Sequence, residues 1–408
     1  MTGFGVENLP FGVARMPDGS VGCVSALEAS VLDLGALARA GSLDEAAVPD
    51  GVFEDASLNR FLACGRQAWR AVRGRLARLV REGDPALAKA AVPAHAVQLL
   101  APVAVGDFVD FSASLHHATR VGRLLRPEGD PLPPQWRHMP VGYHGRAGSI
   151  LVSGTGVARP YGQVPSNGTG PVVAPTSALD FEAEVGFVVG AGSPQGTRIA
   201  TNAFAEHVAG VVLVNDWSAR DVQAFESRPL GPFGGKSFAT SVSPWLVTLD
   251  ALDPYRVDGP AQEPRPPSYL RTNGTAAYEL HVEVTLQSAA MRDEGTPPLR
   301  VSTARFDSMY WTAPQLLAHA TVNGAGTRPG DLFASGTVSG PSAGSEACLL
   351  ELTRAGERPL ALPDGSTRGY LEDGDTVVVR GWAGGDGRPL LCLGEVTGTV
   401  LPARPMEV

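Results

Sequence analysis

The sequence predicts a mainly β protein with some α-helix, and three observations support this fold class. The 408-residue chain contains 49 glycines and 34 prolines, which indicates many turns between short strands. Over residues 1 to about 50, short apolar runs alternate with turn residues. From Asp55 to about Arg81, apolar residues instead recur at helical spacing, with arginines on the opposite face. We therefore expect a small β-barrel or roll, one amphipathic helix, and then further strands.

A domain boundary follows this helix. Gly-Asp-Pro at 83–85 ends the helical pattern, and the segment between Pro93 and Pro102 is typical of a connection between domains. The prediction is an N-terminal domain over residues 1–102 and a C-terminal domain over residues 103–408, which suits a chain of this length.

The predicted second domain carries polar residues inside apolar segments. Residues 103–111 predict a strand, or a strand-turn-strand unit, that ends in Asp110, and a helix is expected to begin near Ser114. Residues 211–214 predict a buried strand that stops at Asn215. Turn signals and a strand at 376–380 predict that the last part of the chain is all-β.

Charge and composition exclude several classes of function. The net charge is −9, and no basic block concentrates the 33 lysines and arginines, which argues against nucleic acid or an anionic membrane as partner. The sequence has no apolar run of 18 residues, and residues 1–8 lack a charged start followed by an apolar segment, so we expect a cytoplasmic protein. The four cysteines lack metal-type spacing and are expected to be reduced thiols.

The most informative stretch is residues 179–189, which predict a strand. Side chains two apart share a face of a strand, so Glu182 and Glu184 lie together. Two buried carboxylates need a cation or arginines to offset their repulsion. A solvent-facing edge strand is the alternative, but the run from Val185 to Val189 is too apolar on both faces for an edge. The pair therefore predicts half of a site for a hard cation.

Asp110 and Asp216, at predicted strand ends, are candidates for the other half of this site. No cysteine or histidine lies at ligand spacing beside these carboxylates, so Mg²⁺ or Ca²⁺ fits better than zinc. Taken singly, each of the two aspartates is more typical of a turn or a helix cap than of a metal site.

His117 is a candidate general base. It becomes one if a carboxylate orients it, and Glu351, a charge inside the apolar segment 349–352 that we interpret as a strand, is the candidate partner. A histidine that only packs is the alternative, and composition does not distinguish His117 from His116 or His144.

Lysine occurs at only two positions, Lys89 and Lys236, in a chain that otherwise uses arginine. A lysine kept in the glycine-rich loop 230–240 indicates a need for a compact point donor. A phosphate-binding loop is the alternative, but Gly-Gly-Lys-Ser here lacks the upstream glycine of that motif.

The chain resembles the fumarylacetoacetase family essentially from end to end, beginning at residues 7–13. The motifs that carry the resemblance are Pro-Val-Gly-Tyr-His-Gly-Arg at 140–146, Asn-Asp-Trp-Ser-Ala-Arg-Asp at 215–221, Gly-Lys-Ser-Phe at 235–238, Arg-Pro-Gly-Asp-Leu at 328–332 and Ala-Ser-Gly-Thr at 334–337. The resemblance implies an N-terminal SH3-like β-barrel, a C-terminal mixed β-roll domain, a homodimer and a small-molecule substrate.

The resemblance also implies roles for individual residues. It implies divalent-metal ligands at Asp110, Glu182, Glu184 and Asp216, and a second cation site at Thr240 and the carbonyl of Lys236. It implies His117 as the water-activating base and Glu351 as the acid that orients it. It implies oxyanion donors at Arg220, Gln223 and Lys236, and substrate contacts at Arg126, Tyr143, Gln223 and Thr337.

Two positions depart from the family pattern. Ser112 and Ser227 stand where the family has substrate-binding tyrosines. Two short hydroxyl side chains widen the pocket and remove far-reaching donors, so we expect a larger or differently charged substrate, with Arg228 replacing a lost contact to a carboxylate.

The predicted function is metal-dependent hydrolysis of a carbon–carbon bond in a 1,3-dicarbonyl acid, either fumarylacetoacetate or a larger relative. A lyase or decarboxylase that forms an enolate without attack by water is the alternative enzyme. A binding module with a purely structural ion is the alternative outside catalysis.

Overall fold

A 13-stranded sheet organises the computed structural model, which describes residues 4–166, 168, 170–385 and 387–406. Its main strand order is β4-β3-β2-β1-β17-β14-β13-β22-β6-β7. The strands are β1 (Phe11–Arg15), β2 (Val21–Leu27), β3 (Ser30–Asp33), β4 (Ala91–Pro93), β5 (Gln98–Leu100), β6 (Phe108–Phe111), β7 (Gly142–His144), β8 (Ile150–Val152), β13 (Ala183–Val189), β14 (Val208–Asp216), β16 (Thr240–Val242), β17 (Trp245–Thr248) and β22 (Leu332–Ala334).

A second sheet has five strands in the order β21-β20-β25-β26-β9. Its strands are β9 (Val157–Ala158), β20 (Leu280–Gln287), β21 (Leu299–Arg305), β25 (Thr376–Gly385) and β26 (Arg388–Leu401). Four strand pairs complete the β structure. They are β10 (Tyr161–Val164) with β11 (Val172–Pro175), β12 (Leu179–Asp180) with β15 (Ser218–Ala219), β18 (Arg256–Val257) with β19 (Ala277–Tyr278), and β23 (Leu360–Ala361) with β24 (Thr367–Arg368).

The helices are short apart from α3, so the mainly β prediction with some helix is confirmed. They are α1 (Leu34–Arg39), α2 (Asn59–Leu62), α3 (Arg66–Glu82), α4 (Pro85–Ala90), α5 (Leu115–Leu125), α6 (Phe204–His207), α7 (Arg220–Glu226), α8 (Gly234–Ser237), α9 (Leu249–Leu252), α10 (Ala289–Asp293), α11 (Ala313–Thr321) and α12 (Leu349–Leu352). In the described part of the chain, no helix is long and apolar enough to cross a membrane.

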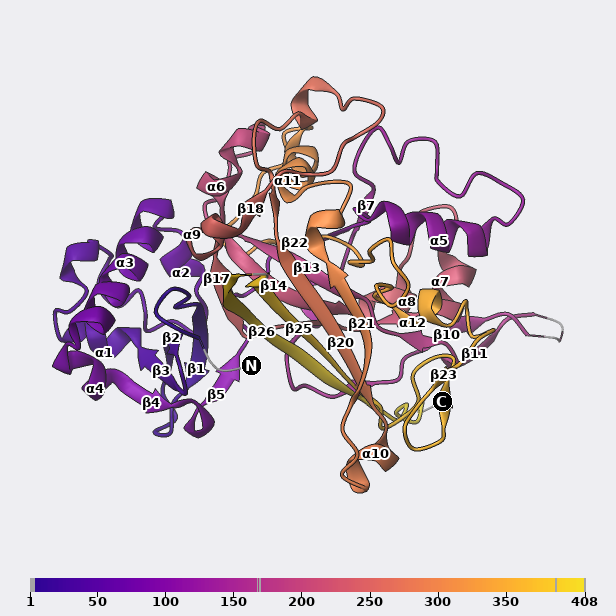
Figure 1. The fold of residues 1–408 in the computed structure, drawn as a ribbon, viewed down its shortest axis with the longest axis horizontal. Helices are drawn as coiled ribbons and strands as arrows, with labels where there is room; N and C mark the ends of the chain where they lie inside the picture. Colours follow the sequence, from indigo (N-terminus) through magenta and orange to yellow (C-terminus); the bar gives the residue numbers. More distant parts are fainter. Residues whose placement is uncertain (1–3, 167, 169, 386, 407–408) are drawn as a thin grey trace.

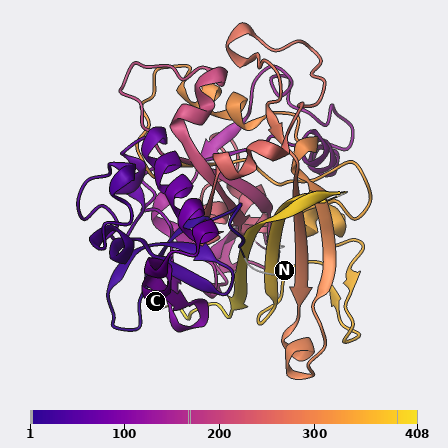
Figure 2. The ribbon, with the colours of Figure 1, turned by 60° about the vertical axis from the view of Figure 1, so that its left-hand side comes forward.

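The predicted N-terminal elements are present with two differences. The expected helix from Asp55 is divided into α2 and α3, because Gly65 between them adopts a positive φ of 84°. Strands β1 to β5 pair in the order β5-β1-β2-β3-β4, and β1 also pairs with β17 of the large sheet. No pairing in the described residues closes β4 onto β5, so the SH3-like barrel stays a prediction. Figures 1 and 2 show this indigo-to-violet region beside the rest of the molecule.

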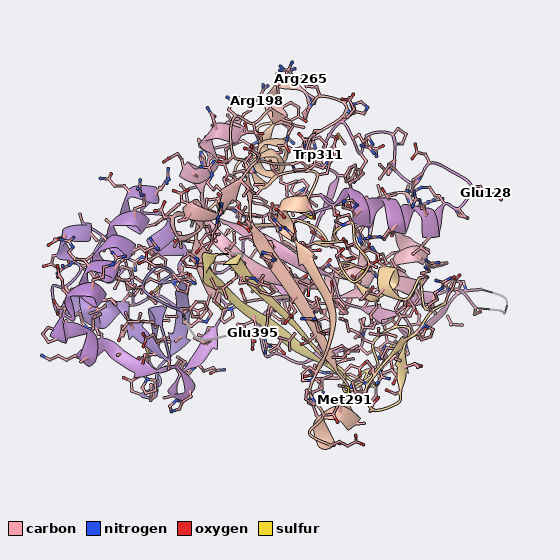
Figure 3. All side chains as sticks on the ribbon, in the orientation of Figure 1. Glu128, Arg198, Arg265, Met291, Trp311 and Glu395 are labelled. Atoms are coloured by element: carbon pink, nitrogen blue, oxygen red, sulfur yellow. The ribbon has the colours of Figure 1, made fainter. Side chains whose placement is uncertain are left out.

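The two sheets face each other across the main hydrophobic core. Val185 and Leu213 of the large sheet and Val284 and Val379 of the five-stranded sheet belong to one cluster of buried side chains. Trp311 and Met291, labelled in the upper and lower parts of Figure 3, belong to the same cluster. The opposite faces of β13 and β14 contribute to a second cluster, which also contains the apolar side of α3. β13 and β14 are therefore buried on both faces, and the edge-strand alternative is excluded.

Three local predictions are wrong. The strand expected over residues 179–189 is interrupted at Phe181 and Glu182, because β12 pairs with β15 whereas β13 pairs with β14 and β22. The strand ending at Asn215 continues through Asp216. Residues 349–352 form the helix α12, so the last part of the chain is not all-β.

Candidate active site

Four acidic side chains gather at one edge of the 13-stranded sheet. β14, β22 and β6 end at this edge and β13 begins there, because β13 is antiparallel to β14 and β22, and β6 is parallel to β22. Oxygen atoms of the four carboxylates lie within 4.8 Å of one another, and the residues are Asp110, Glu182, Glu184 and Asp216. All four are buried. The structure thus brings together the residues that the strand pattern and the strand ends singled out.

These carboxylates need a cation. The Oδ1 atom of Asp110 and both side-chain oxygens of Glu184 are buried without a hydrogen-bond partner among the described residues. Burial and the neighbouring Asp216 raise the pKa of Asp110 to about 8, and burial and Asp110 raise the pKa of Glu184 well above its usual value. Unpaired carboxylate oxygens at this spacing are the donors that Mg²⁺ and Ca²⁺ prefer, so the side chains fit a hard divalent cation.

The ammonium of Lys236 lies among the same carboxylates. Its Nζ donates to Oε2 of Glu182 at 2.7 Å and to Oδ2 of Asp216 at 2.6 Å. Burial opposes the charge of Lys236, but the two carboxylates raise its pKa above the usual value. Tyr143 and Thr240 also donate to Asp216, at 2.8 and 3.1 Å. The structure shows the ammonium of Lys236 at the cluster, and a second cation site at its carbonyl stays a prediction.

Close backbone packing positions Lys236. A Cβ atom at Gly235 would lie 2.7 Å from the backbone nitrogen of Gln223, so only glycine lets α8 approach α7 here. Glu226 accepts hydrogen bonds from the backbone N–H groups of Phe233, Gly234 and Gly235 at 2.7, 2.9 and 2.8 Å. The glycine-rich loop therefore packs against α7, and α7 carries two of the other candidate residues.

Arg220 and Gln223 lie on α7, beside Glu182. The Nη1 atom of Arg220 donates to Oε1 of Glu182 at 2.6 Å and to Oε1 of Gln223 at 3.3 Å. Lys236 reaches the other oxygen of the same Glu182. Although burial opposes it, the charges of Lys236 and Arg220 lower the pKa of Glu182. Two of the three predicted oxyanion donors, Arg220 and Lys236, therefore meet at one carboxylate, and Gln223 contacts Arg220.

His117, on α5, forms a pair with Glu351 on α12. The Nδ1 atom of His117 lies 2.7 Å from Oε2 of Glu351, which also accepts from Ser339 at 2.6 Å. Burial opposes ionisation of Glu351, but His117 and these hydrogen bonds lower its pKa to about 2. The Nε2 atom of His117 lies 3.4 Å from Oγ1 of Thr337. His117 also contributes to the lowered pKa of Glu182, after Lys236 and Arg220.

The turn that presents Thr337 to His117 requires a glycine. Gly336 has a φ of 75°, and a Cβ atom there would lie 2.0 Å from the carbonyl oxygen of Phe111. Figure 1 shows α5, α7, α8 and α12 grouped on one side of the sheets, near the edge that carries the acidic side chains.

Three predicted substrate contacts make no hydrogen bond to this cluster in the described residues. Arg126 donates to the backbone carbonyls of Asp130 and Pro131. The hydroxyl of Ser227 bonds the carbonyl of Gln223. Ser112 contributes backbone hydrogen bonds, including a carbonyl that accepts from Trp136 at 3.1 Å. The described residues give these three side chains no hydrogen bond to the four carboxylates, so their contact with substrate stays a prediction.

Sequence reasoning missed Asp180, Ser339 and Arg120. Asp180 binds the guanidinium of Arg220, while Ser339 and Arg120 donate to Glu351 at 2.6 and 3.3 Å. A signal for Asp180 was available, because it lies two residues before Glu182 and continues the same alternation of acidic residues. Nothing in the sequence near Ser339 or Arg120 marked either residue.

Family models match almost the whole chain. Residues 7–105 match the model described as "Fumarylacetoacetase N-terminal", and residues 108–401 match "Fumarylacetoacetate (FAA) hydrolase C-terminal". The chain is 42% identical over 412 residues to the fumarylacetoacetase of Arabidopsis thaliana, covering 98% of this chain and 96% of that protein. It is 40% identical over 411 residues to the Homo sapiens fumarylacetoacetase, with the same coverages. The chain belongs to the fumarylacetoacetase family.

Membership of the fumarylacetoacetase family makes this chain an enzyme that acts on a carbon–carbon bond, and it confirms the resemblance seen in the motifs. The fold agrees. A fumarylacetoacetate hydrolase structure from psychrophilic Exiguobacterium antarcticum superposes with a TM-score of 0.56 at 17% identity, covering 97% of this chain and 100% of that chain.

Proposed function

We propose that the chain is a metal-dependent hydrolase that cleaves a carbon–carbon bond of a 1,3-dicarbonyl acid, either fumarylacetoacetate or a larger related compound. The observation that carries the proposal is a set of four buried carboxylates, with unpaired oxygens, beside a His–Glu pair. The names of the relatives, fumarylacetoacetases at about 40% identity over nearly the full length, support the same substrate class.

Asp110, Glu182, Glu184 and Asp216 would hold Mg²⁺ or Ca²⁺, and Thr240 with the carbonyl of Lys236 would hold a second cation. When bound, a divalent ion supplies Lewis-acid polarisation of a carbonyl oxygen and stabilises negative charge that develops there. The unpaired oxygens of Asp110 and Glu184 support this assignment.

His117 acts as the general base at its Nε2 atom. Since the pKa of Glu351 is lowered to about 2, its carboxylate is ionised at neutral pH and accepts the Nδ1–H of His117. The lone pair is then on Nε2, which lies on the side of Thr337. Nε2 takes a proton from water, and the resulting hydroxide attacks a carbonyl carbon of the substrate.

Arg220, Gln223 and Lys236 donate to the oxyanion that forms when water attacks. One such donor typically lowers the barrier by roughly 3–4 kcal/mol. When the carbon–carbon bond breaks, its electron pair stays on the leaving carbon, and the ammonium of Lys236 returns a proton to that carbon. The raised pKa of Lys236 supports this role, because it keeps the ammonium protonated until a basic carbon is present.

An acidic substrate is supported by a pocket of 270 Å³ beside the cluster, which Tyr143 and Lys236 line together with His144, Arg146 and Phe233. None of its lining residues is acidic. The guanidinium of Arg146 lies 5.8 Å from the centre of the Phe233 ring and has no carboxylate partner in the described residues.

Tyr143, Gln223, Thr337 and Arg126 are the further substrate contacts of this proposal, with the short side chains of Ser112 and Ser227 widening the space available. We also propose a cytoplasmic homodimer, which light scattering after gel filtration and fractionation of cells would test.

Hydrolysis of a panel of 1,3-diketo acids, followed by loss of enol absorbance with and without Mg²⁺ or Ca²⁺, tests the function. His117→Ala should lower kcat about 10²–10⁴-fold, because removal of a general base costs that much. His116→Ala, its neighbour on α5, is the control and should retain activity. If His117→Ala keeps near wild-type turnover, the chain is instead a lyase or decarboxylase that needs no water-activating base.

A further inference from the structure

One buried carboxylate that is not a proposed metal ligand contacts both Arg220 on α7 and the start of α12, the helix that carries Glu351. Asp180, at the end of β12, is 0% exposed. Its Oδ1 atom accepts from the backbone N–H of Leu349 at 2.7 Å, and its Oδ2 atom from that of Leu350 at 2.9 Å. The same Oδ2 accepts from Nε and Nη2 of Arg220 at 2.9 and 2.8 Å.

The bonds to Leu349 and Leu350 fix the start of α12. The first N–H groups of a helix have no partner inside the helix, and a nearby side chain usually caps them. Cys348, at the cap position of α12, makes no such bond. Asp180 provides it instead, from 169 residues earlier in the chain. Because α12 has only four residues and Glu351 is the third, the carboxylate that caps the helix also sets where Glu351 lies.

The hydrogen bonds from Arg220 to Asp180 fix the orientation of the guanidinium on α7. Two of the guanidinium nitrogens are occupied by Asp180, which leaves Nη1 directed at Glu182, at 2.6 Å. A planar guanidinium held along one edge cannot rotate, so its remaining donor has one direction. Asp180 is therefore the link between α7, with its candidate oxyanion donor, and α12, with the carboxylate that orients His117.

We propose that Asp180 is a positioning residue that holds the His117–Glu351 pair and the Arg220 donor in one frame. This inference rests on the hydrolysis proposed above for its catalytic meaning. Asp180 acts through the His117–Glu351 pair and Arg220, which it holds in place. A substitution to asparagine keeps the shape but removes the charge and turns one acceptor into an N–H donor, which then faces an N–H of α12 or the guanidinium of Arg220.

The chain offers a matched control for general destabilisation. Asp375 is also 0% exposed, accepts from Nε and Nη2 of Arg368 at 2.8 and 3.0 Å, and accepts from the backbone N–H of Glu372 at 2.8 Å. It has the same chemistry as Asp180 but contacts none of the candidate catalytic residues. A merely structural role for Asp180 predicts that Asp180→Asn and Asp375→Asn behave alike.

The test uses the full-length protein labelled with ¹⁵N-histidine. The ring nitrogens of His117 report whether Nδ1 still donates to a carboxylate. We expect Asp180→Asn to shift the Nδ1 resonance of His117 in the same direction as Glu351→Gln, and Asp375→Asn to leave it unchanged. Asp180→Glu retains a charged partner for Arg220 and is the second variant, in case the asparagine variant does not fold. A folded Asp180 variant whose His117 resonance matches the wild type overturns the proposal.

Kinetics separate this inference from the proposed function. If the wild type hydrolyses a diketo acid, Asp180→Asn should lower kcat at least tenfold with little change in KM. The losses of Asp180→Asn and Glu351→Gln should multiply only in part in the double variant, because both act through His117 whereas Asp180 also acts through Arg220. Full multiplication of the two losses counts against the inference alone. Absence of hydrolysis by the wild type counts against the proposed function alone, since the resonance of His117 requires no substrate.

Discussion

Glu184 and Asp375 are both fully buried carboxylates, and they differ in what surrounds them. Both oxygens of Asp375 accept hydrogen bonds, from Arg368 and from the backbone of Glu372. In the part of the chain that the structure describes, neither oxygen of Glu184 has a hydrogen-bond partner, and its neighbours include further carboxylates. Burial is therefore equal, and the number of satisfied acceptors distinguishes a structural acid from one held ready for a ligand.

This difference has an energetic meaning. A buried charge without partners costs several kcal/mol, which a folded chain tolerates where a ligand offsets it. A cation bound to the four-carboxylate cluster would offset that cost, whereas Asp375 and Arg368 already offset each other's charge inside the fold. Four measurements test this difference between the two kinds of buried acid.

Asp375→Asn should have the largest effect on stability. Removal of this buried carboxylate leaves Arg368 with only the exposed Glu372 as an ion-pair partner among the described residues, whose Oε2 lies 3.3 Å from Nη1, and costs about 3 kcal/mol. Chemical denaturation followed by circular dichroism measures this loss, and turnover per folded molecule should be unchanged. A loss below 1 kcal/mol would mean that the pair is not the structural element described here.

Asp110→Asn should increase the free energy of unfolding when no divalent cation is present. The pKa of Asp110 is raised to about 8, so the folded form holds a proton that the unfolded form has already lost at pH 7. The stability that this group contributes is fully present below pH 4 and is lost as the pH rises toward 8. At pH 7 this loss is roughly 2–4 kcal/mol, and Asp110→Asn removes it. Equal denaturation midpoints for variant and wild type at pH 8 would contradict this.

Addition of Mg²⁺ or Ca²⁺ should stabilise the wild type in a pH-dependent way. A ligand at 100 times its Kd stabilises by about 2.7 kcal/mol. Because Asp110 must lose its proton before it can bind the ion, the increase in Tm should be larger at pH 8 than at pH 5.5. Thermal unfolding at the two pH values measures this, with Glu184→Gln as the variant that should respond weakly at both.

Arg146→Leu should have the smallest of the four effects, a modest rise in KM, because this guanidinium is exposed rather than buried. An exposed ion pair contributes about 1 kcal/mol at most, which corresponds to a rise in KM of about fivefold for a substrate with a carboxylate in the adjoining pocket. Arg265→Leu is the control, since Arg265 is also exposed but does not line that pocket. An equal KM in the two variants would place the carboxylate elsewhere.

Strand periodicity predicted the part of the site that depends on local pattern. Alternation placed Glu182 beside Glu184, and the apolar run after them correctly excluded an edge strand. The same reasoning failed at residues 349–352, because a four-residue apolar segment with one charge fits a strand or a helical turn equally well. The deciding interaction there is the capping by Asp180, a contact across 169 residues that no local pattern contains.

The interruption at Phe181 and Glu182 has a similar origin. The pattern of residues 179–189 is continuous, but β12 and β13 pair with different strands. Choice of partner strand is a property of the whole chain, so the sequence indicated which side chains share a face and not where the strand changes partner.

Pairing of β1 with β17 gives the N-terminal region a consequence beyond its own packing. β17 lies between β1 and β14, whose last residue is Asp216. A chain shortened to begin at residue 103 would leave β17 as an open edge beside the first half of β14, with backbone donors and acceptors free to bind a second molecule. The N-terminal strands therefore cover an edge of the large sheet, and a shortened enzyme is expected to aggregate through the uncovered strand β17.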